Sequence, residues 1–253
     1  MHAWGTHLIV LVRFFLAWTF TLLLAAVACL AVLVLGPTRM WTTFCHLWSR
    51  GTLWLVGVRM HVQGREHLAA PAVFIVNHES LIDVVFMPAI LPNTVRFVAK
   101  KSIMYIPIFG WAFAAGGAVL IDRRRPREAL ESMRRGVAGL PAGWSIIVFP
   151  EGTRPRAPGL GRFKKGAFLL AIESGLPVVP IGVVGARSIS PPAGWLVRGG
   201  DVWVSIGAPI STEEWHLTSL PTHVAAGRAA VATCIAQAQA MVPAAATVAS
   251  GNP

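Results

Sequence analysis

The sequence predicts an α/β domain with a mostly parallel central sheet flanked by helices, preceded by an N-terminal pair of membrane-attaching helices. Short apolar runs alternate with helix-like segments after Gly64, which is typical of βαβ units. An uncharged stretch of 25 residues, 14–38, precedes them. The 253 residues suffice for one such domain and an appendage. We therefore expect helices over 1–58, the domain over 59–222, and a C-terminal helix with a disordered tail over 223–253.

The uncharged stretch is flanked by Arg13 and Arg39 and is long enough to cross about 30 Å of hydrocarbon as a helix. A signal peptide has a shorter apolar core of about 7 to 15 residues and a cleavage site of small residues. Here Pro37 ends the run. A second, tryptophan-rich stretch at 40–58 suits the headgroup level of a bilayer, or it is a core helix that packs on the first.

Six strands are expected, and several are continuous β-branched runs typical of strands buried on both faces; they lie at 72–77, 95–99, 117–121, 144–149, 177–183 and 202–207. Helices are expected at 125–140, 164–175 and 223–242.

The composition points to an anionic partner. The chain carries 22 Lys and Arg against 11 Asp and Glu, it is 55% hydrophobic, and only 13% of its residues are charged. The excess of positive charge suits phospholipid, phosphorylated substrate or nucleic acid, but the hydrophobicity favours a membrane, and nucleic-acid motifs are missing from the sequence. We expect a location at the bacterial inner membrane, with the active site on the cytoplasmic side. Neither metal-ligand spacing nor a P-loop is present, so no metal is expected.

The segment "NHESLID", 77–83, places a histidine and an aspartate where a strand turns into a helix. The spacing from Ser80 to Asp83 is that of a capping box, which gives Asp83 a structural explanation. On one continuous helix, residues five apart differ by about 140° in direction. If His78 lies in the turn before the helix, its ring can fold back towards Asp83. Alone, this spacing favours a structural histidine over a catalytic one.

Three further segments follow in order: 106–123, "FPEGTR" at 149–154, and "LPVVPIGV" at 176–183. With these blocks the sequence resembles the lysophosphatidic acid acyltransferase family over roughly residues 60–210. It departs from the common family pattern at four positions, which are Glu79 (often Gln), Ser102 (often Glu), Leu120 (often Phe) and Pro155 (often Ser).

The resemblance implies that neutral His78 is the general base and that Asp83 fixes its tautomer. It also implies that the acceptor phosphate is held by Arg123 and by four residues of the second motif, Glu151, Gly152, Thr153 and Arg154. Without the other motifs, "FPEGTR" would read as a turn with a solvated arginine. Lys100 adds to the positive charge that gathers around these motifs. No cofactor is expected, because acyl-CoA or acyl carrier protein serves as co-substrate.

We therefore expect an acyltransferase that moves a fatty acyl group to the sn-2 hydroxyl of 1-acylglycerol 3-phosphate and forms phosphatidic acid. One alternative is acylation of another acceptor, such as lyso-ornithine lipid or glycerol 3-phosphate. The alternative from another class is a catalytically silent lipid-binding membrane protein that keeps the fold.

Overall fold

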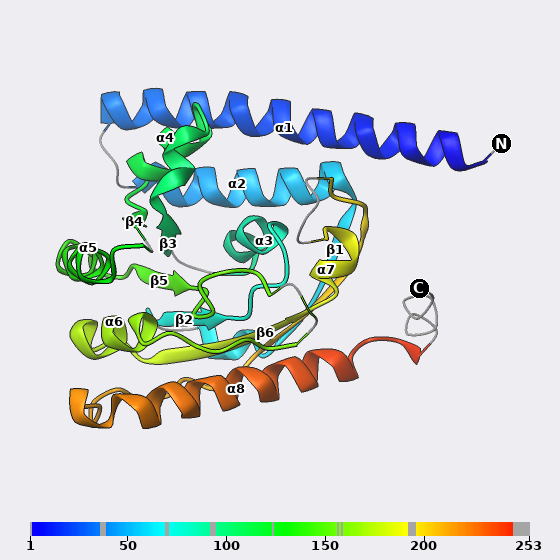
Figure 1. The fold of residues 1–253 in the computed structure, drawn as a ribbon. Coiled ribbons are helices and arrows are strands. Elements are labelled where there is room, and N and C mark those ends of the chain that lie inside the picture. The colour runs from blue at the N-terminus through cyan, green and yellow to red at the C-terminus, as the bar shows by residue number, and fades with distance from the viewer. Residues whose placement is uncertain are drawn as a thin grey trace.

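The computed structural model describes residues 2–35, 39–68, 71–91, 95–122, 124–155, 157, 159–191 and 196–244, with the side chains of 2–6, 35, 39, 40 and 126 excepted. A central sheet has helices on both faces, and a long N-terminal helix lies across one side (Figure 1). This architecture confirms the predicted fold class. Arg123 and Pro37, two residues of the sequence predictions, lie outside the described residues.

Seven strands form the sheet in the order β1-β7-β6-β2-β5-β3-β4. All neighbouring strands pair in parallel except β6 and β7, which are antiparallel. The strands are β1 (Val58–Gln63), β2 (Val73–Val76), β3 (Val95–Lys100), β4 (Val119–Ile121), β5 (Ser145–Val148), β6 (Val178–Val184) and β7 (Gly200–Ile206).

The edge strand β1 was missing from the six predicted strands. Its residues alternate between buried or half-buried apolar side chains and exposed polar ones, Arg59, His61 and Gln63. This alternation suits an edge strand with one face in water. The strand was missed because it directly follows the apolar N-terminal helices and because its partner β7 lies 142 residues further along the chain. The prediction that helical attachment extends to residue 58 therefore runs one residue into the sheet.

The helices are α1 (His2–Leu35), α2 (Arg39–Val56), α3 (Ile82–Ile90), α4 (Phe109–Ala115), α5 (Pro126–Ala138), α6 (Gly166–Ser174), α7 (Ala186–Ile189) and α8 (Leu220–Ala240), with 3₁₀ turns at Arg65–Leu68, Lys101–Tyr105 and Leu217–Ser219. The predicted helices at 125–140, 164–175 and 223–242 correspond to α5, α6 and α8. Helix α8 begins three residues earlier than predicted, with a proline in its first turn, where proline is tolerated because no hydrogen bond is lost.

Two buried apolar clusters lie on opposite faces of the sheet. Alternate residues of β2 serve each one, so that Phe74 joins the cluster that includes Phe86 of α3, whereas Ile75 joins the cluster that includes Phe168 of α6 and Val231 of α8. This is the period of two that a strand imposes. Helices α2 and α3 cover one face, and α6 and α8 cover the other (Figure 1).

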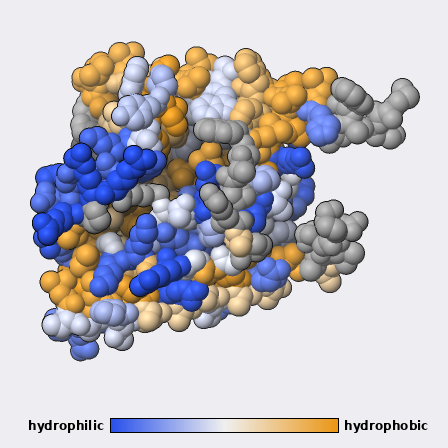
Figure 2. Space-filling view, viewed as in Figure 1, coloured by the Kyte–Doolittle hydropathy of each residue, from blue (hydrophilic) through white to orange (hydrophobic). Residues whose placement is uncertain are grey.

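Helix α1 packs against α2 and α4, and its N-terminal part extends past the rest of the molecule (Figure 1). Residues 7–34 have the length and composition of a helix that crosses a membrane. Its outer surface is apolar (Figure 2), with many exposed large side chains that include Leu8, Val12, Phe15, Leu23, Leu30 and Leu33. Such a continuous exposed apolar surface marks a membrane or protein contact.

Candidate active site

Four neighbouring parallel strands bring the predicted site residues to one edge of the sheet. In the order β2-β5-β3-β4, the strands end just before His78, before Glu151, at Lys100 and before residue 123. The carboxyl ends of parallel strands meet at the same edge, about 4.8 Å apart, and ligands of open α/β sheets bind there. The fold therefore explains why segments 70 residues apart in sequence contribute to one site.

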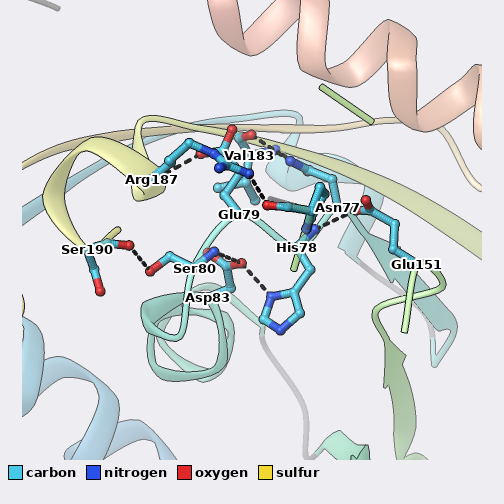
Figure 3. A network of polar contacts seen from close by, with 10 residues as sticks. Asn77, His78, Glu79, Ser80, Asp83, Glu151, Val183, Arg187 and Ser190 are labelled. Carbon is cyan, nitrogen blue, oxygen red and sulfur yellow. Dashed lines mark hydrogen bonds and ion pairs between the residues drawn. The ribbon is translucent and has the colours of Figure 1, made fainter. Parts of the chain in front are cut away.

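His78 and Asp83 are in direct contact. His78 Nδ1 lies 2.7 Å from Asp83 Oδ2, and the ring of His78 stacks on Phe149 with centroids 4.3 Å apart. Helix α3 begins only at Ile82, so His78 occupies the turn before it, and its ring folds back towards Asp83, which is one of the arrangements that the sequence allowed (Figure 3). Asp83 is completely buried, whereas the side chain of His78 remains 15% exposed. The pair is therefore shielded on the aspartate side and open on the histidine side.

Half of the predicted capping box is present. The Ser80 backbone N–H donates to Asp83 Oδ2 at 2.9 Å, which is the reach-back half of that motif. The Ser80 hydroxyl instead donates to the Ser190 carbonyl. Asp83 Oδ2 thus accepts two hydrogen bonds, and Oδ1 has no hydrogen-bond partner among the described residues. The structural and catalytic explanations of Asp83 are compatible.

Glu151 fixes the backbone of the histidine. Its buried carboxylate accepts the His78 N–H at 2.9 Å and the Gly161 N–H at 2.8 Å. On the other side, the Asn77 amide exchanges two hydrogen bonds with the backbone of Val183. The resemblance assigned Glu151 to the acceptor phosphate, but both of its oxygens are engaged by backbone amides. Its contacts are those of a group that positions the turn that carries His78.

The rest of the second motif and Lys164 form a basic corner, which consists of Gly152, Thr153, Arg154 and Lys164. Gly152 has a φ of +73°, a backbone conformation that favours glycine, and a Cβ there would lie 2.8 Å from the ammonium nitrogen of the flexible Lys164 side chain. Thr153 is exposed and Arg154 is half-buried. Within the described residues, no hydrogen bond or ion pair engages the side chain of Arg154 or Lys164. Lys100 is exposed two strands away from β2.

A third carboxyl group next to the pair has an unusual acidity. Burial, together with the nearby charge of Asp83, raises the pKa of Glu79 from 4.5 to about 7, although the backbone N–H groups of Arg187 and Ala186 and the charge of Arg187 oppose the shift. Glu79 was noted in the sequence only as a departure from the common pattern. Arg187 was missed altogether, because nothing in its local sequence distinguishes it from a surface arginine.

Three of the other histidines have contacts of a structural kind. His46 and His67 bond to backbone carbonyls, and His223 bonds to the Ser219 hydroxyl. His61 is the exception, because its Nε2 lies 2.8 Å from Asp201 Oδ1, an acid 140 residues away that sequence spacing could not reveal. In the part of the chain that the structure describes, no three His, Cys, Asp or Glu side chains are grouped as metal ligands.

An apolar cavity lies between the N-terminal helices, α4 and one part of the sheet. Side chains of α1, α2, α4 and β3 line it, among them Ala28, Trp48, Phe97 and Ala112. The ring of Trp48 packs against Phe109 of α4 with centroids 5.7 Å apart. The cavity therefore depends on the N-terminal helices being docked on the domain.

Comparison with known proteins places this site in a family. Residues 59–184 match the family model described as Acyltransferase. The 1-acyl-sn-glycerol-3-phosphate acyltransferase of Limnanthes douglasii is 33% identical over 187 residues, which cover 74% of this chain and 66% of that protein. The protein of the same name from Pseudomonas aeruginosa is 34% identical over 172 residues, covering 66% of each chain. The chain thus spans less than two thirds of the length of these curated relatives.

A solved structure supports the fold. The crystal structure of the 1-acyl-sn-glycerophosphate acyltransferase from Thermotoga maritima superposes with a TM-score of 0.76 at 21% identity, covering 96% of this chain and 100% of that one. Its coverage includes nearly all of the chain, so the N-terminal helices are part of the shared fold. The matched family model and the curated relatives show that the chain belongs to the acyltransferase family of the 1-acyl-sn-glycerol-3-phosphate acyltransferases.

Proposed function

We propose that this protein transfers a fatty acyl group from acyl-CoA or acyl carrier protein to the sn-2 hydroxyl of 1-acylglycerol 3-phosphate, forming phosphatidic acid. The observation that carries the proposal is the 2.7 Å contact between His78 Nδ1 and the fully buried Asp83. It holds Nδ1 as the protonated nitrogen, and Nε2, which has no described partner, is then the basic one. The names of the curated relatives support the choice of acceptor.

In the proposed reaction, Nε2 of His78 takes the proton of the acceptor hydroxyl as its oxygen attacks the thioester carbonyl carbon. The tetrahedral intermediate collapses, the C–S bond breaks, and the imidazolium returns the proton to the leaving thiolate. Asp83 stabilises the imidazolium in between, as the aspartate of a catalytic triad does. Since the substrate hydroxyl takes the place of an enzyme serine, no acyl-enzyme forms.

The basic corner supplies the acceptor site in this proposal. Arg154 is the first candidate for the phosphate, because it is half-buried three residues after Glu151, which bonds to the His78 N–H, and its side chain has no described protein partner. A guanidinium can bind phosphate oxygens in bidentate fashion. Gly152 and Thr153 lie in the same turn. Lys100, at the end of β3, adds a longer-range positive charge, and Arg123 keeps the role in phosphate binding that the resemblance implies.

The membrane would deliver both lipid substrates. The apolar surface of α1 and the exposed Trp54 and Trp111 support attachment to a bilayer. We propose the inner membrane of a bacterium, with the site on the cytoplasmic side where both donors are available. The apolar cavity between α1, α2 and α4 is a candidate for the acyl chain of one substrate, and replacing Ala112 on its wall by Phe would then shift acylation towards shorter chains.

The test is a panel of acceptors offered to the purified protein in detergent with labelled acyl-CoA and acyl carrier protein. We expect incorporation into 1-acylglycerol 3-phosphate, much less into 1-acylglycerol without the phosphate, and none with the His78→Ala variant. Preference for lyso-ornithine lipid or glycerol 3-phosphate would move the acceptor assignment to that lipid. Binding of lipids without transfer to any of them would contradict the enzymatic proposal.

A further inference from the structure

The catalytic turn is joined to the turn after β6 by a set of polar contacts that the reaction itself does not use. Asn77 bonds to Val183, Glu79 to Arg187, and Ser80 to Ser190, so three residues of the segment 77–80 contact the segment 183–190 (Figure 3). The first and third contacts involve neutral groups. Only the second joins a carboxyl group to a residue of opposite charge.

Arg187 extends this connection to the basic corner. Its backbone N–H donates to Glu79 Oε2 at 3.2 Å. Its guanidinium donates from Nη2 to the carbonyl of Pro155 at 2.8 Å and to that of Ala157 at 3.3 Å. Pro155 directly follows Arg154, the candidate phosphate ligand. One arginine therefore holds the chain beside Arg154 at its side-chain end and the residue beside His78 at its backbone end.

We infer that Glu79 is a positioning residue which, through Arg187, holds the segment after Arg154 in place for the acceptor phosphate, and which does so best as the carboxylate. The inference rests on the proposed function. An ionised carboxylate attracts the Arg187 charge and accepts stronger hydrogen bonds from the backbone N–H groups than a neutral carboxyl does. Losing the charge would loosen Arg187, and with it the backbone next to Arg154, without moving His78 or Asp83.

The ionisation of Glu79 gives this inference a pH signature. The pKa of Glu79 lies at about 7, raised by burial and by Asp83 of α3 and lowered by the backbone amides and the charge of Arg187 of α7. Glu79 is thus ionised above neutral pH and protonated below it. His78 is its neighbour in the chain but faces Asp83. Acceptor binding should therefore weaken as the pH falls from 8 to 6, beyond any change in the rate of the chemical step.

The decisive variant is Glu79→Gln, which keeps the shape and an oxygen that can accept a hydrogen bond but is neutral at every pH. Initial rates with 1-oleoylglycerol 3-phosphate and oleoyl-CoA in detergent would be measured at pH 6 and pH 8. At pH 8 we expect KM for the acceptor to rise about fivefold, the difference between a charged and a neutral hydrogen bond, while kcat and KM for the donor stay within twofold. At pH 6 wild type and variant should converge.

Two further variants separate positioning from general folding. Arg187→Gln should raise KM for the acceptor at pH 8 to a similar extent, and combining it with Glu79→Gln should add little, because both break one connection. Glu213→Gln removes an exposed carboxylate elsewhere and should leave both constants and their pH dependence unchanged. An equal effect of Glu79→Gln at both pH values, or a fall in kcat with KM unchanged, would overturn the inference.

The same experiment distinguishes this inference from the proposed function. If wild type transfers no acyl group, the proposed function is wrong, and the inference is then decided by the rise in melting temperature that 1-oleoylglycerol 3-phosphate causes at pH 6 and pH 8. Weaker stabilisation of Glu79→Gln than of wild type at pH 8 alone supports it. Equal stabilisation of both proteins at pH 8 contradicts it.

Discussion

The molecule contains two histidine–aspartate contacts of nearly equal length and very different surroundings. His78 Nδ1 lies 2.7 Å from an aspartate with no exposed surface, whereas His61 Nε2 lies 2.8 Å from Asp201, whose side chain is 26% exposed. Asp201 also receives two hydrogen bonds from the exposed guanidinium of Arg59. A short contact therefore does not by itself make a catalytic pair.

The two contacts differ in how deeply the aspartate is buried and in whether an arginine shares its carboxylate. The hydrogen bonds of Arg59, followed by that of His61, hold the pKa of Asp201 well below its usual range, so that its charge is already balanced by Arg59. His61 stacks on Trp203 and uses its Nε2 for the aspartate, which leaves it at the wet edge of the sheet. His78 uses Nδ1, and its Nε2 is directed away from the supporting network (Figure 3). Only the arrangement of His78 suits proton transfer from a bound substrate.

Removal of each imidazole should give the largest contrast. His78→Ala should lower kcat by about 10²- to 10⁴-fold, the usual contribution of a general base, whereas His61→Ala should keep kcat within about twofold of wild type. Initial rates of phosphatidic acid formation at saturating substrates measure both, with circular dichroism to confirm folding. Comparable losses of kcat in the two variants would mean that His78 is not distinguished from His61 as the general base.

Neutralising each aspartate should give a smaller contrast of the same sign. In Asp83→Asn the amide oxygen can still accept from His78 and Ser80, but the charge that stabilises the imidazolium is lost, so kcat should fall by about 10²-fold or more. Asp201→Asn should leave kcat unchanged. The assay is the same, and a fully active Asp83→Asn would show that Asp83 only caps the helix.

The sequence was informative where structure is local. The turn before α3 places His78 against Asp83 within five residues, so capping and helix geometry showed that their contact was possible, and the resemblance to a family selected it. Five of the six predicted strands are apolar runs buried in the core, which period and composition reveal. The sixth, predicted at 202–207, corresponds to β7, which begins two residues earlier at Gly200 and ends at Ile206, but its pairing with β1 and its antiparallel direction next to β6 depend on long-range topology.

The sequence was uninformative where a contact joins distant segments through single polar residues. Arg187 reaches Glu79 across 108 residues, and Asp201 reaches His61 across 140. Glu151 was assigned to the phosphate by resemblance, and its motif does not reveal that its carboxylate accepts hydrogen bonds from two backbone amides. Such partners are fixed by sheet order, which places β1 beside β7 and brings the ends of β2, β5 and β6 together.

Glu79, whose pKa is raised, and Asp201, whose pKa is lowered, should affect the stability of the protein in opposite ways as the pH changes. Folded Glu79 keeps its proton up to a pH of about 7, whereas the unfolded chain releases it near the ordinary value of 4.5. Unfolding therefore releases a proton between these values, and Glu79 makes the protein less stable as the pH rises. Glu79→Gln should melt a few degrees above wild type at pH 8 and close to it at pH 5. A melting-temperature difference that is the same at both pH values would show that Glu79 does not titrate in this range.

Asp201 should show the reverse and smallest effect. Because its pKa is depressed in the folded protein, its contribution to stability is present above the ordinary pKa of an aspartate and is lost as the pH falls below it. The contribution is small, since Arg59 and His61 are exposed and water screens their charges. Asp201→Asn should lower the melting temperature at pH 7 by no more than about 3 °C, and 1 M salt should abolish even this difference because it screens exposed ion pairs. A larger loss that persists in salt would mean that Asp201, like Asp83, is held in a site from which solvent is excluded.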